Sequence, residues 1–246
     1  MAPVTLTTET QQDYRSNSLW RLTLRRILRQ RSAVIGLVIL GFLLLVAALA
    51  NVIAPYDPEQ VLIGVEDGVK KRMAPCIHIL GCPVEQTEHI FGTDGNVRDQ
   101  FSRVIFGTRY SLFIGFSTIS FAIIIGTLLG AISGYVGGWV DNIIMRLLDV
   151  LMAFPSLLLA ITIVSVLGPG LQNALLAIAI VTIPVYARVV RASVLSIKEM
   201  PYVAASKALG GSSLHILVSR VLPNAIPPLI VTGTLGIGTA ILDAAA

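Results

Sequence analysis

The 246-residue chain is 54% hydrophobic and only 13% charged. Soluble domains carry about 25% charged residues, so this composition excludes an ordinary soluble protein and favours an integral membrane protein. The net charge of +4 is small, and the basic residues form no tail of the kind that binds nucleic acid. We therefore expect no nucleic-acid partner.

Residues 1–31 are polar and end in a basic cluster. Between Leu19 and Leu28 apolar residues alternate with arginines at roughly helical spacing, which is typical of a short amphipathic helix on an anionic membrane surface. A solvated basic flank that only sets the orientation of the chain is an equal alternative. The arginines of this cluster are Arg15, Arg21, Arg25, Arg26, Arg29 and Arg31.

Residues 32–56 are uncharged and predict the first transmembrane helix, since a span needs about 20 apolar residues. A cleaved signal peptide is the alternative, because residues 48–50 resemble a cleavage site. The apolar run is, however, longer than the usual signal-peptide core of about 7–15 residues. Basic residues concentrate on the cytoplasmic side of membrane proteins, so we expect the N-terminus to lie in the cytoplasm.

Residues 57–110 then predict a substantial extracytoplasmic loop. It contains Cys76 and Cys82, and two nearby cysteines in an oxidising compartment usually form a disulfide; two free thiols are the alternative. A metal site that includes His78 or His89 is disfavoured, because the spacing is not that of metal ligands. The last part of the loop, residues 101–110, mixes arginines with apolar residues and predicts a short interfacial helix.

A second span is expected over about residues 111–134. Gly126, Gly130, Gly134 and Gly138 recur every four residues, so on a helix they share one face. Small residues on such a face let a neighbouring helix approach closely in lipid, and we predict a helix-packing role for all four. The alternative is that glycine is simply common in membrane helices.

The next apolar stretch is too long for one span. Gly168-Pro169-Gly170 divides it into a predicted hairpin of spans at residues 142–167 and 171–190. Pro155 and Pro184 interrupt these spans and predict kinks, since proline leaves a helical carbonyl without its partner.

Asp149 is an acid at the start of the third span. Intramembrane acids are functional suspects, but Arg146 lies three residues earlier on the same helix face. Side chains at that spacing meet, so we predict a structural ion pair between the two, or an acid whose side chain snorkels to the interface.

A fifth apolar run begins at Val221 and continues almost to the end of the chain. The predicted cytoplasmic segments then hold twelve basic residues and the outer loop six, which is the asymmetry expected of membrane proteins. The predicted fold class is an all-α membrane protein, a polytopic helix bundle with five spans.

The main polar interruption of the second half lies between the fourth and fifth spans. Residues 199–224 predict an amphipathic helix, a turn at Gly210-Gly211, a second short helix and a stop at Pro223. The charge asymmetry places this segment in the cytoplasm. So structured a segment between two spans is expected to contact a partner; an ordinary solvated loop is the alternative.

This segment resembles the cytoplasmic loop of the membrane-spanning subunits of bacterial ABC importers. Their pattern is Glu-Ala-Ala, three residues, glycine, nine residues and Ile-x-Leu-Pro. Residues 204–206 stand where Glu-Ala-Ala stands in that pattern, Gly210 at the glycine and Leu222-Pro223 at the Leu-Pro pair. The first acid is absent, Ser206 replaces the last alanine, and Arg220 takes the isoleucine position.

Further stretches are similar to the dipeptide, oligopeptide and nickel permeases of that family, in particular to the C-type subunit. Residues 91–112 resemble the signature GTDxxGRDxxSRxxxGxRxSL, with Asn96-Val97 before Arg-Asp where glycine is expected. Residues 145–155 and 187–191 resemble two more signatures. The likeness covers about residues 20–246. The family has six spans, so the resemblance implies that this chain lacks the last one.

The resemblance implies a permease core over residues 111–246, whose loop at residues 191–223 docks as a coupling helix on an ATPase. The implied partners are a second homologous permease subunit, two ATPase subunits, an extracytoplasmic solute-binding protein and the lipid bilayer, in a bacterial inner membrane. Lys207 and Arg220 would pair with acids on the ATPase. The residues assigned to coupling are Tyr202, Ala204, Ala205, Ser206, Lys207, Gly210, Arg220 and Pro223.

No catalytic, cofactor or metal residue is assigned. The sequence contains no phosphate-binding GxxxxGK loop, so ATP hydrolysis is expected in partner subunits. A secondary transporter or channel is the alternative. Such proteins usually carry charges at mid-membrane, whereas Asp149 and Asp243 lie near span ends. A simple membrane anchor is a third possibility, and the sequence does not identify the cargo.

Overall fold

The structure, a computed structural model, describes residues 28–66, 68–83 and 86–245. It divides into two compact units on either side of the Thr108–Arg109 bond, and each is described by itself. The amphipathic segment expected over residues 1–31 lies outside the described residues as far as residue 27.

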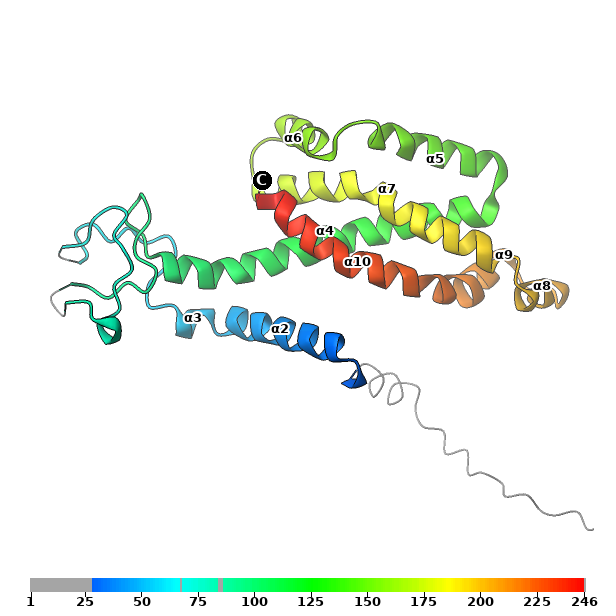
Figure 1. Ribbon diagram of the computed structural model, residues 1–246. Helices are drawn as coiled ribbons and strands as arrows, with labels where there is room; N and C mark the ends of the chain where they lie inside the picture. Colours follow the sequence, from blue (N-terminus) through cyan, green and yellow to red (C-terminus); the bar gives the residue numbers. More distant parts are fainter. Residues whose placement is uncertain (1–27, 67, 84–85, 246) are drawn as a thin grey trace, which may run out of the picture. The chain divides into compact units, whose positions relative to one another are not determined.

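The first unit contains α2, Arg31–Ala48, the short α3, Ala50–Ile53, the 3-10 helix η1, His78–Leu80, and the beginning of α4 (Figure 1). The span predicted at residues 32–56 therefore ends earlier, at Ile53. Ala54 adopts an extended conformation, as expected for a residue that precedes a proline. Most apolar side chains of α2 are exposed, which suits a helix surrounded by lipid.

The helix α4, Gln100–Val136, is continuous over 37 residues. The separate interfacial helix predicted at residues 101–110 is therefore wrong: these residues form the first turns of α4. The stretch contains no proline, and the single Gly107 does not interrupt the hydrogen-bond ladder.

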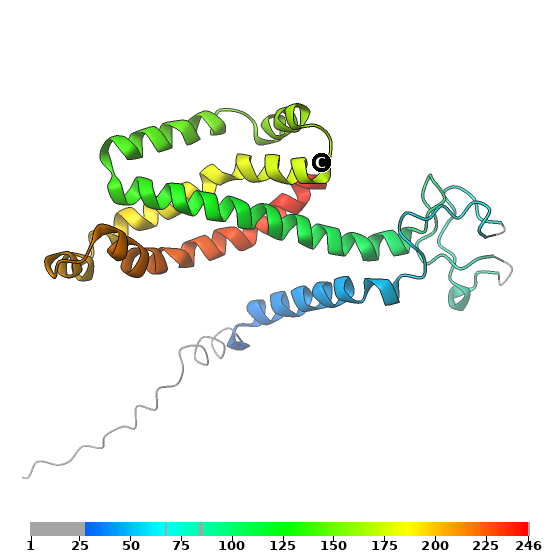
Figure 2. The same cartoon turned by 180° about the vertical axis from the view of Figure 1, so that it is seen from behind.

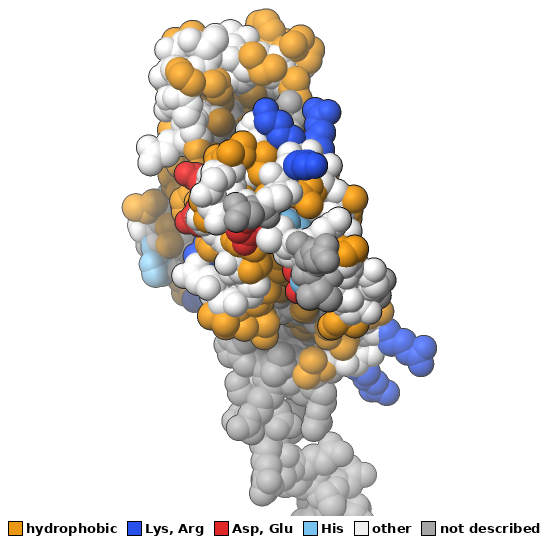
Figure 3. Space-filling model, turned by 90° about the vertical axis from the view of Figure 1, so that its left-hand side faces the viewer, with side chains coloured by type: hydrophobic (Ala, Val, Ile, Leu, Met, Phe, Trp, Pro, Cys, Tyr) orange, Lys and Arg blue, Asp and Glu red, His pale blue; other side chains and the backbone are white. Residues whose placement is uncertain are grey.

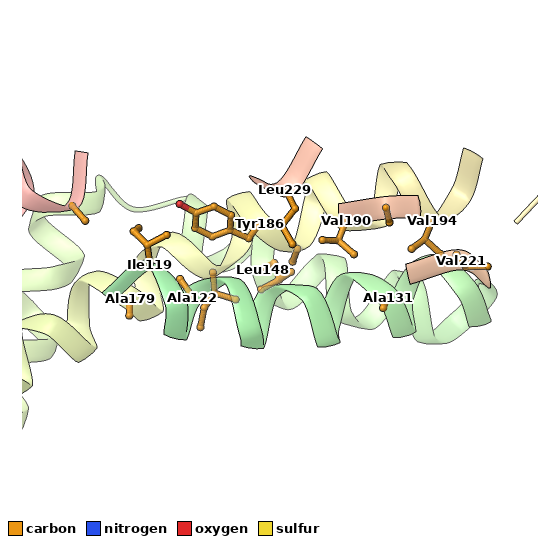
Figure 4. Packing of buried hydrophobic residues seen from close by; sticks show 14 of the residues in the cluster. Ile119, Ala122, Ala131, Leu148, Ala179, Tyr186, Val190, Val194, Val221 and Leu229 are labelled. Carbon is orange, nitrogen blue, oxygen red and sulfur yellow. The ribbon is translucent and has the colours of Figure 1, made fainter. Parts of the chain in front are cut away.

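The second unit is built around α7, Leu171–Ile197, which contacts α5, α6 and α10 (Figures 1 and 2). The remaining elements are α5, Gly138–Met152; α6, Ser156–Leu167; α8, Pro201–Ala208; α9, Ser213–Ile216; the π-helical turn η2, Leu217–Val221; and α10, Leu222–Ala245. Its core joins side chains of several helices, among them Ile119 of α4, Tyr186 and Val190 of α7 and Leu229 of α10 (Figure 4).

The third predicted span is broken. The helices α5 and α6 are bent by 92° relative to each other, at a break that contains Pro155. Proline has no amide N–H and cannot continue a helix without distortion. The predicted interruption is thus a sharp bend between two helices, not a kink within one. Pro184, by contrast, lies inside α7 without ending it.

The proline stop predicted at Pro223 is wrong, because α9, η2 and α10 follow one another as one helical run. The amide of Leu222 donates to the carbonyl of Leu217, five residues back. A proline in a regular helix clashes with the carbonyl four residues earlier. The wider π-helical turn just before Pro223 accommodates this ring without ending the helix.

In the described part of the chain, four helices are long and apolar enough to cross a membrane: Arg31–Ala48, Gln100–Val136, Leu171–Ile197 and Ser213–Ala245. The bent α5–α6 pair makes a fifth if it counts as one span. The predicted all-α polytopic membrane fold is confirmed. On the face drawn in Figure 3, charged side chains of both signs stand among many hydrophobic ones.

Candidate functional site

The helix α8 is the centre of the polar segment that the sequence singles out. Pro201 occupies its first turn, where the missing amide N–H costs nothing because that group has no partner in a helix. The helix ends at Ala208, and Leu209 follows with 89% of its surface exposed. A short helix thus stands between α7 and α9.

This helix has two different faces. Val203 is fully buried in the core of the second unit. One helical turn later, Lys207 places Nζ 5.8 Å from the ring centroid of Tyr135, at the end of α4. Residues four apart lie on the same side of a helix, so Val203 and Lys207 together attach α8 to the bundle. The Lys207 ammonium group thus faces the Tyr135 ring, and its pairing with an acid on a partner stays a prediction.

The opposite face of α8 is exposed and made of small residues. Ala204, Ala205 and Ala208 are all exposed, and Tyr202 beside them exposes 42% of its surface. Ser206 is half-buried and donates from Oγ to the Tyr202 carbonyl at 2.8 Å. These exposed residues are uncharged and mostly have short side chains, so another protein can pack closely against them.

The turn after α8 depends on two glycines for different reasons. Gly210 has a φ of +82° with open space around it, so it supplies a left-handed conformation that other residues adopt at a cost. A Cβ on Gly211 would lie 2.9 Å from the carbonyl oxygen of Ser206. Ser212 then caps α9 by accepting a hydrogen bond from the amide of His215 at 3.4 Å.

Arg220 and Pro223 lie at the end of the segment. Both side chains are exposed, and the Arg220 carbonyl accepts a hydrogen bond from Asn224 Nδ2 at 2.7 Å. The two residues belong to the π-helical turn and the first turn of α10, not to α8. The predicted coupling residues thus occupy two places, the exposed face of α8 and the start of α10.

Three of the four predicted packing glycines line the contact between α4 and α7. A Cβ on Gly126 would lie 2.8 Å from the Tyr186 Cβ, and one on Gly130 would lie 2.3 Å from the Ala187 carbonyl oxygen. One on Gly134 would lie 3.0 Å from the Arg191 carbonyl oxygen. Only glycine permits so close an approach of two helix backbones.

Gly138 does not belong to this face. The helix α4 ends at Val136, and Gly138 begins α5 after the turn at Gly137. No heavy atom lies within 4 Å of a Cβ built on it. The four-residue spacing does not place Gly138 on this face of α4, because the chain turns at Gly137 before it.

Two ion pairs tie α5 to α7. Asp141 accepts hydrogen bonds from Arg191 Nε and Nη2 at 2.5 Å each, a bidentate geometry that fixes orientation. Asp149 pairs with Arg188 Nη2 at 2.6 Å. The prediction that Asp149 pairs with Arg146 is wrong, because the partner comes from a neighbouring helix that sequence spacing does not reveal.

In the first unit, the residues that resemble the permease signature make contacts that stabilise the loop to which they belong. A Cβ on Gly92 would lie 2.1 Å from the Met73 carbonyl oxygen. Thr93 Oγ1 accepts from the Met73 amide at 3.0 Å and donates to the Lys70 carbonyl at 2.7 Å. These contacts connect two parts of the loop that are about 20 residues apart in the sequence.

Asp94 is the centre of a second set of contacts. It accepts hydrogen bonds from the Asn96 amide, from the amide and Nε of Arg98, and from Arg103 Nη1. Burial raises the pKa of the Asp94 carboxyl, but the backbone hydrogen bonds from Arg98 and Asn96 and the Arg98 guanidinium outweigh it and hold the pKa below its ordinary value. The resulting stabilisation is present above the unfolded-state pKa and is lost as the pH falls through the folded-state pKa.

A buried polar network fixes the entry into α4. Asp99 Oδ2 accepts from the Ser102 amide at 2.7 Å, which is the geometry of a helix N-cap. Its other oxygen contacts His89 Nδ1 at 3.0 Å. Ser102 Oγ accepts from the Tyr56 amide at 3.1 Å. His89, Asp99 and Ser102 are each at most 1% exposed, so the signature residues serve to fold this loop.

Cys76 and Cys82 form a disulfide with a Cα–Cα distance of 5.5 Å. The bond lies in the same loop, and the Cys76 amide also donates to the His89 carbonyl at 2.8 Å. The disulfide therefore closes a small turn beside the buried network.

The described part of the chain shows modest cavities and no grouped metal ligands. Among these residues, no three His, Cys, Asp or Glu side chains are grouped to hold a metal ion. A largely apolar cavity of about 220 Å³ lies between α6, α7 and the end of α10. Two larger cavities, of about 300 Å³ between α4 and α7 and about 410 Å³ beside Tyr56 and Asp99, reach only the lower end of the range of about 300–1,000 Å³ of ligand pockets. The features with functional geometry are thus α8 and the helix contacts behind it.

Comparisons with known proteins give a consistent result. Residues 126–246 match the family described as binding-protein-dependent transport system inner membrane component, and residues 18–75 match the N-terminal transmembrane domain of oligopeptide transport permease C. The chain is 41% identical over 238 residues to a dipeptide transport system permease protein of Alkalihalophilus pseudofirmus, covering 95% of this chain and 72% of that protein.

Two further relatives are similar over most of the chain. A dipeptide transport system permease protein of Haemophilus influenzae is 42% identical over 217 residues, covering 88% of this chain and 70% of the relative. A glutathione transport system permease protein of Pectobacterium atrosepticum is 37% identical over 226 residues, covering 92% and 70%.

Proposed function

The chain belongs to the family of binding-protein-dependent inner-membrane transport components and is a permease subunit of an ABC importer, and from this premise we propose that α8 is the coupling helix that docks on the ATPase. As a multi-pass inner-membrane protein, such a permease works with ATPase and binding-protein partners. The observation that carries the proposal is the two-faced structure of α8. One face is anchored in the bundle and the other is exposed.

The exposed face has the properties that a docking helix needs. Ala204, Ala205 and Ala208 have short side chains, so a partner surface can reach the helix backbone closely. Tyr202 and the exposed Leu209 at its edges offer apolar contact area, and exposed aromatic residues are enriched at protein interfaces. A displacement of the ATPase would then move α8 and the core to which Val203 belongs.

The rest of the assembly follows the family pattern. We propose two ATPase subunits, a second homologous permease subunit that completes the translocation path, and an extracytoplasmic binding protein that delivers the cargo. The absence of a GxxxxGK loop in the sequence supports hydrolysis of ATP by the partners. The excess of basic residues in residues 1–31 and 188–220 supports a cytoplasmic position for the N-terminus and for α8.

The proposed cargo is a short peptide. Relatives that are 37–42% identical are named for dipeptide or glutathione transport, and these molecules share a small peptide backbone with charged groups. The family assignment excludes the alternative of a secondary transporter or channel.

The proposal is tested by purification of the importer from membranes. Ala205→Trp places a bulky ring on the exposed face of α8, and we expect it to lower the amount of co-purified ATPase by about tenfold, which corresponds to about 1.4 kcal/mol. Ala74→Trp, the same change at an exposed alanine of the outer loop, is the control and should have no effect. If Ala205→Trp leaves co-purification unchanged, α8 is not the docking helix.

A further inference from the structure

We propose that the last turn of α4, residues 133–135, is the junction through which a displacement of α8 reaches the membrane helices, and that Lys207 and Tyr135 are its positioning residues. This inference rests on the proposed docking of α8. It adds the route by which the movement continues into the bundle, and assigns roles to side chains outside the docking face.

The contact between Lys207 and Tyr135 links α8 directly to α4. The ammonium group lies 5.8 Å from the ring centroid, within the distance at which a cation is attracted to an aromatic face. The residues are 72 positions apart in the sequence (207 minus 135), so no local geometry imposes the contact. Val203, on the same face of α8, is packed in the core that Tyr135 also contacts.

The same turn of α4 is fastened to α5 and α7. Ser133 is fully buried and donates from Oγ to Asp141 of α5. Asp141 in turn is held in a bidentate pair by Arg191 of α7. Lys198, near the end of α7, donates from Nζ to the Gly134 carbonyl at 3.0 Å. A cation is favourable at a helix C-terminus because the last carbonyls have no partner within the helix.

Three consecutive residues of α4 therefore each hold a different element. Ser133 reaches α5, Gly134 lies against α7, and Tyr135 meets α8. The backbone approach at Gly134, where a Cβ would lie 3.0 Å from the Arg191 carbonyl oxygen, leaves little room for sliding. A displacement of α8 is thus passed to α4, α5 and α7 together, as coupling through a packed network requires.

The Tyr135 hydroxyl allows a matched control. In the part of the chain that the structure describes, this oxygen is buried and makes no hydrogen bond. Tyr135→Phe therefore keeps the aromatic face for Lys207 and removes only the unused hydroxyl. Tyr135→Leu removes the face. Lys207→Arg keeps the cation, and Lys207→Gln removes it.

The experiment follows α4 with a spin label on Ser120→Cys, an exposed position of α4, in the assembled importer in lipid nanodiscs. The native cysteines are bonded to each other and do not take the label. The spectrum is compared between the nucleotide-free complex and the complex trapped with ATP and vanadate, so no cargo is required. We expect a clear spectral change with Tyr135 and Lys207 intact.

Tyr135→Leu and Lys207→Gln should each reduce this spectral change at least about fivefold, whereas Tyr135→Phe and Lys207→Arg should retain it. The double variant Tyr135→Leu/Lys207→Gln should be no worse than either single variant, because residues that act through one contact are not additive. All variants should still co-purify with the ATPase.

Three results would overturn the inference. The first is the absence of a nucleotide-dependent spectral change at α4 in the labelled protein with Tyr135 and Lys207 intact. The second is an equal loss of the spectral change in Tyr135→Phe and Tyr135→Leu. The third is a loss of the spectral change in the double variant that equals the sum of the losses in the two single variants. Failure of the proposed function gives a different result, since Ala205→Trp would then leave the amount of co-purified ATPase unchanged.

Discussion

At the scale of single residues, Gly210 in the turn after α8 is needed for its backbone conformation and not for lack of space. Gly210 has a φ of +82° and nothing near its Cβ position. We predict that Gly210→Ala destabilises the second unit by about 1–2 kcal/mol, the usual cost of a left-handed conformation for an L-residue. Gly210→Asn should cost less although asparagine is larger, since asparagine tolerates this conformation.

Thermal unfolding of the purified chain in detergent measures both variants of Gly210. A larger loss for asparagine than for alanine would mean that side-chain size, and not φ, limits this position. Gly211→Ala is a useful comparison, because its Cβ would meet the Ser206 carbonyl oxygen at 2.9 Å and so tests a steric limit.

Val97 departs from the family signature, and this departure predicts a measurable effect on stability. It stands where the signature has glycine, and it adopts a φ of +59°, an outlier for a β-branched residue. Its side chain is nevertheless only 1% exposed. Strain in the backbone and burial of the side chain therefore oppose each other at this position.

We predict that Val97→Ala is more destabilising than Val97→Gly, by about 1 kcal/mol. Both variants lose the buried methyl groups, but only glycine relieves the left-handed strain of about 1–2 kcal/mol. The order is the reverse of that in regular structure, where glycine is the worse residue. Denaturant titration measures the free energy of unfolding of the two variants. An alanine variant at least as stable as the glycine variant would show that the strain is absent.

Side-chain direction was the least predictable property at this scale. The sequence correctly indicated a turn at Gly210 and a helix before it. It did not indicate that Lys207 points back to Tyr135, because the rotation of α8 about its axis is set by Val203 in the core. In the same way, the partner of Asp149 comes from α7 and not from its own helix.

At the scale of secondary-structure elements, α4 and α7 approach each other closely at three of the predicted glycines. We predict that Gly130→Ala destabilises the unit by about 1–3 kcal/mol, the usual cost of overpacking, because its Cβ would lie 2.3 Å from the Ala187 carbonyl oxygen. Backbone atoms cannot move aside as a flexible side chain does.

The matched control for Gly130 is Gly238→Ala in α10. No heavy atom lies within 4 Å of its Cβ position, so this change should be neutral or stabilising by up to about 1 kcal/mol through helix propensity. Midpoints of thermal unfolding compare the two. Equal effects at both positions would show that the α4–α7 contact does not require glycine.

The sequence predicted which helices exist better than it predicted where each helix begins and ends. Hydropathy predicted the spans, since each needs a long apolar run. It did not predict that residues 101–110 join α4, or that Pro155 causes a 92° bend whereas Pro184 lies inside α7. Whether a proline ends, bends or enters a helix depends on how neighbouring helices pack around it.

At the scale of the whole molecule, the residues of the family signature and residues 199–224, the segment proposed for coupling, have different physical roles. The signature residues Asp94, Asp99 and Ser102 stabilise the loop of the first unit and the start of α4. The segment at residues 199–224 presents an exposed face on α8. The sequence identified both motifs, but only the structure separates residues that fold the protein from those open to a partner.

The docking of α8 on the ATPase is the central claim, and site-specific photocrosslinking tests it most directly. A photoreactive amino acid is placed at Ala205 on the exposed face of α8, and in a second sample at Ile79, which is 92% exposed in the outer loop. We predict a crosslink to the ATPase subunit from position 205 and none from position 79. A crosslink from position 79, or none from position 205 in an assembled and active importer, would contradict the account.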